Sequence, residues 1–365
     1  MVPIPALAIC GSKNSGKTTL IEAVLPRLLA AGLKVAVIKE TGRQPLQADR
    51  SGKDSDRFFQ AGADVLCRSD DEQFLRRHGF YTSPGPGGMA AAVCRHKSQT
   101  PDEVLLCELS AFYDLILVEG PRRLSLPKVW LAAEGEPSLP PEATDVLAVL
   151  PRDGARPAAL LAILDEWLPR LWRAVPVYAG VLIGGASSRM GAAKHLLKSD
   201  GRTWLERTVE QLQGAAVETI LLGRGEVPVS LAGMKRLADV PDASGPLAGI
   251  LSAMRWAPRA SWLIAACDLP LLSRAAVDWL LGCRRPGVWA VLPQLSGRPH
   301  LETLFSHYDF RARPPLEHLA AAGNFRMADL IHSAPVATPT PPPDLASAWA
   351  NVNSPGDLQK LHDET

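Results

Sequence analysis

Leu182-Ile-Gly-Gly-Ala-Ser-Ser-Arg-Met-Gly-Ala-Ala-Lys194 is a glycine-rich stretch that follows an apolar run and ends on a second cation. Gly184 and Gly185 allow the backbone to approach a nucleotide base and its phosphates closely. Arg189 can form a two-pronged contact with phosphate oxygens, and Lys194 adds a compact positive charge. With a strand expected before this stretch and a helix after it, the pattern predicts an α/β unit that wraps a triphosphate.

A second and different phosphate motif lies near the N-terminus, where Gly11-Ser-Lys-Asn-Ser-Gly-Lys-Thr18 matches the Walker A form. An apolar strand at 5–10 precedes it, and an amphipathic helix from Thr18 to Ala31 follows. In this motif the lysine reaches the β- and γ-phosphates, and the threonine hydroxyl binds Mg²⁺. The predicted nucleotide-binding residues are Gly11, Ser12, Asn14, Ser15, Gly16, Lys17, Thr18 and Thr19.

The partner of a Walker A loop is an apolar strand that ends in a carboxylate near the metal. Asp114-Leu-Ile-Leu-Val-Glu119 fits that description, and ligands bind at the carboxyl ends of strands in such sheets. Glu119 is therefore a candidate metal ligand beside Thr18, the alternative being an ordinary solvated acid at a strand end. Further strands are expected at 35–38 and 145–150, which predicts a mainly parallel sheet.

Composition restricts the class of protein. The chain has 365 residues, 47% of them hydrophobic and 21% charged, with a net charge of +1. This length favours two domains, and a charge near zero gives no indication of a nucleic-acid or membrane partner. Six scattered cysteines without a Cys-x-x-Cys pair, and no signal-peptide pattern, lead us to expect reduced thiols and a cytoplasmic location.

The strand-and-helix pattern starts again after a helix expected at 157–172. Ala174-Val-Pro176 is the expected joint, with strands to follow at 177–183, 218–222, 262–267 and 289–292. The Pro-rich stretch 334–344 reads as a surface loop or an extended connector, and a last short helix is expected at 355–362. We therefore expect an α/β protein of two three-layer domains, residues 1–173 and residues 174–365.

Two acids in the second half follow apolar segments. Asp268, in Ala-Ala-Cys-Asp-Leu-Pro, ends a predicted strand and is a natural Mg²⁺ ligand. Asp239 precedes the loop Ser244-Gly-Pro-Leu-Ala-Gly249 and is a second candidate. His300 and His307 lie nearby, either as catalytic groups or as solvated or packed side chains.

The motifs of the first half, in their order, resemble the MobB family of GTP-binding adapter proteins of molybdopterin guanine dinucleotide synthesis. The resemblance covers about residues 5–172 and implies a P-loop NTPase fold with at most weak GTPase activity. It also brings Lys53 and Asp54 of Gly-Lys-Asp-Ser55 into consideration as site residues. The family's His-rich segment is replaced here by Lys39-Glu-Thr-Gly-Arg43, so the role of those imidazoles is not carried over.

The motifs of the second half resemble the MobA family, the molybdenum cofactor guanylyltransferases. The likeness rests on Arg-Met-Gly, Gly-Pro-Leu-Ala-Gly-Ile, Cys-Asp-Leu-Pro and Asn351-Val-Asn353-Ser-Pro, and it covers about residues 177–362. It implies a Rossmann-like nucleotidyltransferase fold that joins the GMP part of GTP to molybdopterin with Mg²⁺ and releases pyrophosphate. Molybdenum-insertion proteins and molybdoenzyme chaperones are the implied partners.

Residue by residue, the second resemblance implies three groups. Leu182, Ile183 and Gly184 would contact guanine, Arg189 and Lys194 would hold the phosphates, and Asp239 would bind the nucleotide. Asp268 would bind Mg²⁺, and Asn351 and Asn353 would lie near the pterin. The catalytic set is thus Arg189, Lys194 and Asp268. Ala193 replaces the family's usual Asp, and Gly223 stands where relatives place Asn.

Three other functions remain open on the sequence. A cytidylyltransferase acting on the same cofactor is the nearest, although Leu-Ile-Gly-Gly resembles the loop of guanine users. A sugar-phosphate nucleotidyltransferase with a kinase-like P-loop domain is the second. The third is a GTP-binding protein whose second domain is catalytically silent, which the departures at Ala193 and Gly223 keep open.

Overall fold

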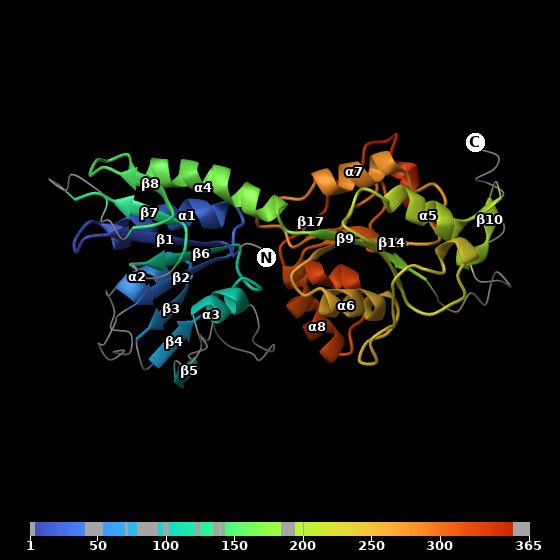
Figure 1. Cartoon of the computed structure of the whole chain (residues 1–365), viewed down its shortest axis with the longest axis horizontal. Helices are drawn as coiled ribbons and strands as arrows, with labels where there is room; N and C mark the ends of the chain where they lie inside the picture. Colours follow the sequence, from blue (N-terminus) through green and yellow to red (C-terminus); the bar gives the residue numbers. More distant parts are fainter. Residues whose placement is uncertain are drawn as a thin grey trace. The chain divides into compact units, whose positions relative to one another are not determined.

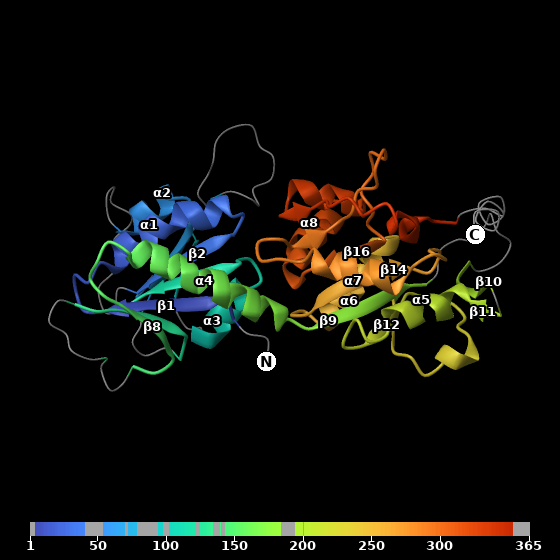
Figure 2. The same cartoon turned by 90° about the horizontal axis from the view of Figure 1, so that it is seen from above.

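A computed structural model describes residues 4–40, 54–69, 72–78, 94–97, 102–120, 125–133, 139, 143–183, 194–199 and 201–352. The chain divides into two compact units, Pro3–Ala174 and Val175–Thr365, which are drawn in Figures 1 and 2. Each unit contains a mixed sheet with helices on both faces, so the predicted α/β class is confirmed.

In the part of the chain that the structure describes, the sheet of the first unit has eight strands in the order β5-β4-β3-β2-β6-β1-β7-β8. The β3–β4 and β4–β5 pairs are antiparallel, and the other described pairs are parallel. β1 lies between β6 and β7, and Ile9 of β1 is in register with Glu119 of β6. The strands are β1 (Ala6–Gly11), β2 (Val35–Glu40), β3 (Asp64–Arg68), β4 (Glu72–Arg76), β5 (Cys94–Lys97), β6 (Leu115–Glu119), β7 (Lys128–Leu131) and β8 (Val146–Leu150).

Helices cover both faces of this sheet, which explains why β1 and β6 are buried along their whole length. The helices are α1 (Lys17–Ala30), α2 (Asp54–Gln60), α3 (Asp102–Leu109) and α4 (Arg156–Arg173). The helical spacing of Leu20, Val24 and Leu28 places all three in one core cluster together with residues of α4. On the other face, α3 packs against alternate residues of the same strands.

The second unit is built on a seven-stranded sheet of order β13-β12-β9-β14-β16-β15-β17 and a small hairpin, β10–β11. Helices α5 and α7 pack on one face of the large sheet, and α6 and α8 pack on the other. The strands are β9 (Val177–Leu182), β10 (Lys198–Ser199), β11 (Arg202–Thr203), β12 (Thr219–Leu222), β13 (Arg236–Leu237), β14 (Ser261–Ala266), β15 (Ala290–Val291), β16 (Phe305–Tyr308) and β17 (Val336–Ala337). The helices are α5 (Trp204–Leu212), α6 (Pro246–Trp256), α7 (Arg274–Gly282) and α8 (Arg313–Ala321), with 3₁₀ turns η1 (Lys194–Leu196), η2 (Val229–Leu231), η3 (Phe310–Ala312), η4 (Met327–His332) and η5 (Ala346–Trp349).

Two expectations were wrong. The helix expected directly after Lys194 is a single 3₁₀ turn followed by the hairpin, and a regular helix begins only at Trp204. There the side chain of Thr203 accepts a hydrogen bond from the Glu206 amide in a capping box, which starts α5. The Pro-rich stretch 334–344 also contributes β17, which pairs with β15. The expected helix at 355–362 lies outside the described residues.

Within the described part of the chain, every helix is too short or too polar to cross a lipid bilayer.

Each unit is expected to fold without the other, because none of the four hydrophobic core clusters combines residues from both. A domain with its own core can fold alone. We expect fragments 1–173 and 174–365, expressed separately, each to show α/β circular dichroism and one cooperative urea transition. Aggregation of both fragments under conditions in which the full chain stays in solution would contradict this.

Candidate functional site

The Walker A loop of the first unit connects β1 to α1 and has the backbone that its glycine predicts. Gly16, just before the helix, adopts a left-handed φ of 91°, and Asn14 has a φ of 64°. The ammonium of Lys17 turns back over the loop and donates to the carbonyl oxygens of Gly11 at 3.2 Å and Ser12 at 2.7 Å. A cation is therefore held at the concave side of the loop, where phosphates would sit.

Among the other predicted residues of this loop, Ser15 is buried and Thr19 is exposed on the first turn of α1. Thr18 meets the strand-end acid, because its hydroxyl donates to Oε1 of Glu119 at 2.5 Å. Glu119 is only 8% exposed, so it is not the freely solvated acid that was the alternative. A hydroxyl and a carboxylate in contact at the phosphate loop are donors that Mg²⁺ accepts, so these residues fit the ion.

Lys39 connects this acid to a second predicted residue. Its ammonium forms an ion pair with Asp54 and lies 3.8 Å from Oε2 of Glu119. Asp54 therefore belongs to the same polar group as Glu119, whereas Lys53 lies outside the described residues. In the sequence, Lys39 stands out only as part of a family motif, and no local pattern indicates this bridging position.

Arg156, at the start of α4, is a residue that sequence reasoning missed. The residue is 8% exposed, and its guanidinium donates to four main-chain carbonyls. One acceptor is Ser15 in the Walker A loop, at 2.6 Å, and the others belong to the ends of β7 and β8: Ala132, Leu150 and Pro151. Burial lowers the pKa of Arg156 from its ordinary value, and neighbouring Arg152 lowers it further. An arginine stays charged through such a shift, so it fixes the loop against the sheet as a cation.

In the second unit, the predicted nucleotide loop begins at the carboxyl end of β9. Leu182 is half-buried, and Ile183 is 5% exposed, which leaves mainly its backbone to face a ligand. Gly184, Gly185 and Arg189 lie outside the described residues. The loop ends at Lys194, whose backbone starts η1 and whose side chain is also outside the description.

Two glycines explain how closely neighbouring elements approach the start of this loop. Gly223 has a φ of 108°, and a Cβ there would lie 2.2 Å from the carbonyl oxygen of Ile183. A residue with a side chain would not fit this backbone at position 223 without a shift. A Cβ on Gly249 of α6 would lie 2.9 Å from Leu182 and 3.3 Å from Oδ1 of Asp239. The fold thus brings Leu182, Ile183 and Asp239 to one end of the sheet.

Asp268 follows β14 at the same end, because β14 runs parallel to β9 and pairs Ala266 with Leu182. The backbone carbonyl of Asp268 accepts a hydrogen bond from the amide of Val352 at 3.2 Å. Val352 is buried and its neighbour Asn351 is exposed, so the C-terminal motif is placed beside the strand-end acid. Asn353 lies outside the described residues.

No cluster of three or more His, Cys, Asp or Glu side chains suited to a metal ion occurs among the described residues. A metal at this end of the sheet could take the carboxylate of Asp268 as a protein donor. That donor set, completed by phosphate oxygens and water, is the one that Mg²⁺ prefers. Asp268 fits it by chemistry and position.

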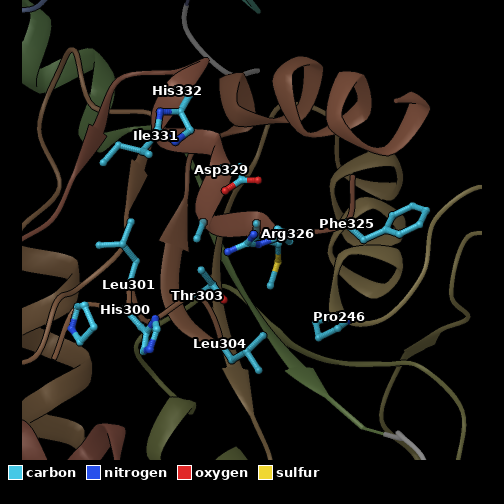
Figure 3. Close-up of a pocket in the computed structure, with 13 residues that line it drawn as sticks. Pro246, His300, Leu301, Thr303, Leu304, Phe325, Arg326, Asp329, Ile331 and His332 are labelled. Carbon is cyan, nitrogen blue, oxygen red and sulfur yellow. The ribbon is translucent and has the colours of Figure 1, made fainter. Parts of the chain in front are cut away.

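A pocket of about 480 Å³ opens beside these elements. Pro246 of α6 and Leu304 contribute to it, and the Leu304 carbonyl accepts from the Ala266 amide at the end of β14. In Figure 3, Arg326 and Asp329 lie near the centre of the view, with His300 and His332 to one side and Phe325 to the other. The lining residues are Pro246, Pro299, His300, Leu301, Thr303, Leu304, Phe325, Arg326, Met327, Ala328, Asp329, Ile331 and His332.

The segment before η4 presents an aromatic ring and a cation to solvent. Phe325 is 39% exposed, and its neighbour Arg326 is exposed as well. The turn is fixed by Asn324, whose side chain accepts from the Arg326 amide at 3.0 Å and donates to Asp329 at 2.9 Å. This arrangement can stack a flat ring and bind a phosphate.

The two histidines differ in environment. His307 lies within β16 and is 1% exposed, and burial, Arg284 and Arg311 hold its pKa well below the usual value. It is therefore a packed neutral imidazole, which supports the structural alternative. His300 is exposed and lines the pocket.

Comparison with known proteins agrees with this arrangement. Residues 6–152 match the family model "Molybdopterin guanine dinucleotide synthesis protein B", and residues 179–336 match "MobA-like NTP transferase domain". A molybdopterin-guanine dinucleotide biosynthesis adapter protein of Haemophilus influenzae is 34% identical over 35% of this chain and 63% of its own length. A probable molybdenum cofactor guanylyltransferase of Bacillus cereus is 31% identical over 42% of this chain and 79% of its own length.

A molybdenum cofactor biosynthesis bifunctional protein of Synechocystis is 28% identical over 51% of this chain and 54% of its own length. The chain therefore spans less than two thirds of the length of the Haemophilus and Synechocystis relatives. The order of the two matched segments agrees with the two resemblances read from the sequence motifs.

Proposed function

We propose that this chain makes molybdopterin guanine dinucleotide. The premise is that the chain belongs to the molybdenum cofactor guanylyltransferase family and that a MobB domain precedes its transferase domain. Residues 174–365 would transfer GMP from GTP to molybdopterin and release pyrophosphate. Residues 1–173 would form a GTP-binding adapter domain. The observation that carries the proposal is the convergence of Ile183, Asp239 and Asp268 at one end of the second sheet.

In the proposed reaction, the terminal phosphate of the pterin attacks the α-phosphorus of GTP. The nucleophile is already an anion, so the protein's task is to position the groups and neutralise charge. Arg189 and Lys194 would hold the phosphates, while the backbone of Leu182, Ile183 and Gly184 would face the guanine. Asp268, and in the first unit Thr18 with Glu119, would hold Mg²⁺. When bound, that ion neutralises the triphosphate.

The pocket beside η4 is proposed as the acceptor site. A pterin is a flat heteroaromatic ring with a phosphate attached through its side chain, and the pocket offers Phe325, Arg326 and two imidazoles. Its volume is within the range of about 300–1,000 Å³ that is usual for small-molecule sites. The exposed Asn351 beside Asp268 would contribute from the C-terminal segment, as would Asn353.

Arg326→Ala is expected to raise KM for molybdopterin about tenfold and to change kcat little. The guanidinium would bind the acceptor equally in the ground and transition states, and losing such uniform binding affects KM alone. Initial rates of pyrophosphate release at varied molybdopterin measure this. Arg285→Ala, which removes an exposed guanidinium outside the pocket, is the control. A KM within twofold of wild type would remove Arg326 from the acceptor site.

The proposed function is tested by incubating the full chain with molybdopterin, Mg²⁺ and each of the four nucleoside triphosphates, and identifying the dinucleotide by mass spectrometry. A guanine dinucleotide supports the proposal. A cytosine dinucleotide would establish the cytidylyltransferase alternative, and no product with any nucleotide would favour a silent second domain.

The P-loop unit would bind GTP through Lys17 and the Walker A backbone, and we propose that it is at most a slow GTPase. Molybdenum-insertion proteins and molybdoenzyme chaperones are the proposed partners of this adapter. Co-purification of the full chain with such proteins, and its loss on deleting residues 1–173, would test this part.

A further inference from the structure

The loop that follows β12, Gly223-Arg-Gly-Glu226, contacts both ends of the phosphate loop. At the first end, the Ile183 amide donates to the carbonyl of Leu222 at 2.8 Å. The Ile183 carbonyl lies so near Gly223 that a Cβ on that residue would be only 2.2 Å from it. The start of the phosphate loop is therefore held against the loop after β12.

The other end is held by a histidine. His195, the residue after Lys194, is 4% exposed, and its Nε2 lies 2.8 Å from the carbonyl oxygen of Glu226. A carbonyl can only accept, so Nε2 carries the hydrogen in this contact. A Cβ on Gly225 would lie 3.1 Å from Cε1 of the same ring, so the missing side chain makes room for the imidazole.

The loop after β12 is itself anchored to the sheet. The Gly223 amide donates to the carbonyl of Leu237 at 2.8 Å, and Arg236 donates to the carbonyl of Gly225 at 2.6 Å. Both partners belong to β13, which pairs with β12. The contact to His195 thus ties η1 to a fixed part of the fold and not to another free loop.

We propose that His195 is a positioning residue for Lys194. Through Glu226 and Gly225 it fixes the 3₁₀ turn that carries the lysine, and so sets the distance between the two ends of the phosphate loop. This inference rests on the proposed function, in which Lys194 neutralises charge at the reacting phosphate. His195 itself touches neither nucleotide nor acceptor in this scheme.

The expected effect is on the rate of the chemical step. A group that stabilises developing charge must be placed closely, and a shift of about 1 Å in such a group can cost on the order of a hundredfold in rate. Loss of an interaction made mainly in the transition state lowers kcat and leaves KM largely unchanged. A purely structural role would instead lower the melting temperature.

The experiment compares full-length variants by pyrophosphate release with molybdopterin, GTP and Mg²⁺. His195→Ala is expected to lower kcat about thirtyfold with KM for GTP within about twofold. His195→Gln, whose amide can donate to the Glu226 carbonyl, is expected to recover most of the rate. Gly225→Ala should lower kcat a few-fold, and Gly233→Ala, where a Cβ meets nothing within 4 Å, is the matched control with no effect.

Combining His195→Ala with Gly225→Ala tests the contact between the two residues directly. In the His195→Ala background, Gly225→Ala should cost less than it does in the wild type, because the ring that its Cβ would displace is gone and only the strain of alanine at a φ of 158° remains. Additive losses would overturn the direct contact. A His195→Ala enzyme with wild-type kcat, or a His195→Gln enzyme as slow as His195→Ala, would overturn the positioning role.

A second measurement does not depend on turnover. Trypsin cleaves after lysine, so the cleavage rate at Lys194, followed by mass spectrometry on the native chain, reports how firmly η1 is held. We expect His195→Ala to raise that rate several-fold and His195→Gln to restore it; unchanged cleavage in His195→Ala would overturn the proposal. If the wild type releases no pyrophosphate, the proposed function fails, while the cleavage assay still decides whether His195 holds the turn.

Discussion

Asp268→Asn is expected to lower the rate of guanylyl transfer by a hundredfold or more. The residue follows β14 at the carboxyl end of the sheet, beside the motif that contains Val352. Asparagine keeps the size of the side chain but removes its charge, and Mg²⁺ binds neutral amides poorly compared with carboxylates. Electrostatic groups of this kind contribute on the order of a hundredfold or more to the rate.

The measurement is pyrophosphate release with molybdopterin and GTP at saturating Mg²⁺, for wild type and variant. Asp278→Asn is the control, because Asp278 is an exposed acid on α7 that pairs with Arg274 on the same helix. GTP binding by the P-loop unit should be unaffected in both variants. A well-folded Asp268→Asn enzyme within about threefold of wild type would remove Asp268 from the metal site.

Lys17→Ala is expected to weaken GTP binding by the first unit on the order of a hundredfold. The ammonium lies over the Walker A loop, held by the carbonyls of Gly11 and Ser12, in the position from which it would reach the β- and γ-phosphates. Hydrogen bonds to charged groups contribute about 1.5–3 kcal/mol each, which corresponds to roughly ten- to more than a hundredfold in affinity. Equilibrium binding of GTP to fragment 1–173 measures the effect directly.

Lys13→Ala is the matched control, since Lys13 is an exposed lysine of the same loop outside the residues that face the phosphates. In the full chain, Lys17→Ala should leave guanylyl transfer largely intact when substrates are abundant. Loss of transfer in that variant would show that the two nucleotide sites are obligatorily coupled, and the adapter role of the first unit would then be wrong.

The sequence predicts the secondary structure most reliably where a single local pattern determines whether a segment is a strand or a helix. Buried strands such as Leu115–Glu119, and the helix that carries Leu20, Val24 and Leu28, are confirmed because apolar periodicity and the Walker A glycine act over a few neighbouring residues. The approach of Thr18 to Glu119 also follows, since parallel strands end at the same edge of a sheet.

Contacts between segments that are distant in the sequence could not be predicted from local patterns. The pocket beside η4 combines α6, the residues before β16 and the turn at Phe325, and no spacing in the sequence relates these segments. The short strand β17 was missed because two residues in a Pro-rich stretch carry no periodic pattern, and it forms by pairing with β15. His195 follows a motif lysine, but its partners lie on a loop about thirty residues further along the chain.

Among the described residues, the guanidinium of Arg156 donates to four main-chain carbonyls, and this has a consequence for how the first unit tolerates mutation. Every residue carries a carbonyl, so changing the side chain of Ala132 or Leu150 cannot delete the acceptor. The network therefore tolerates mutation unequally. The residues that supply its carbonyl acceptors can vary within the limits of packing, whereas the single codon for Arg156 supplies all of its donors.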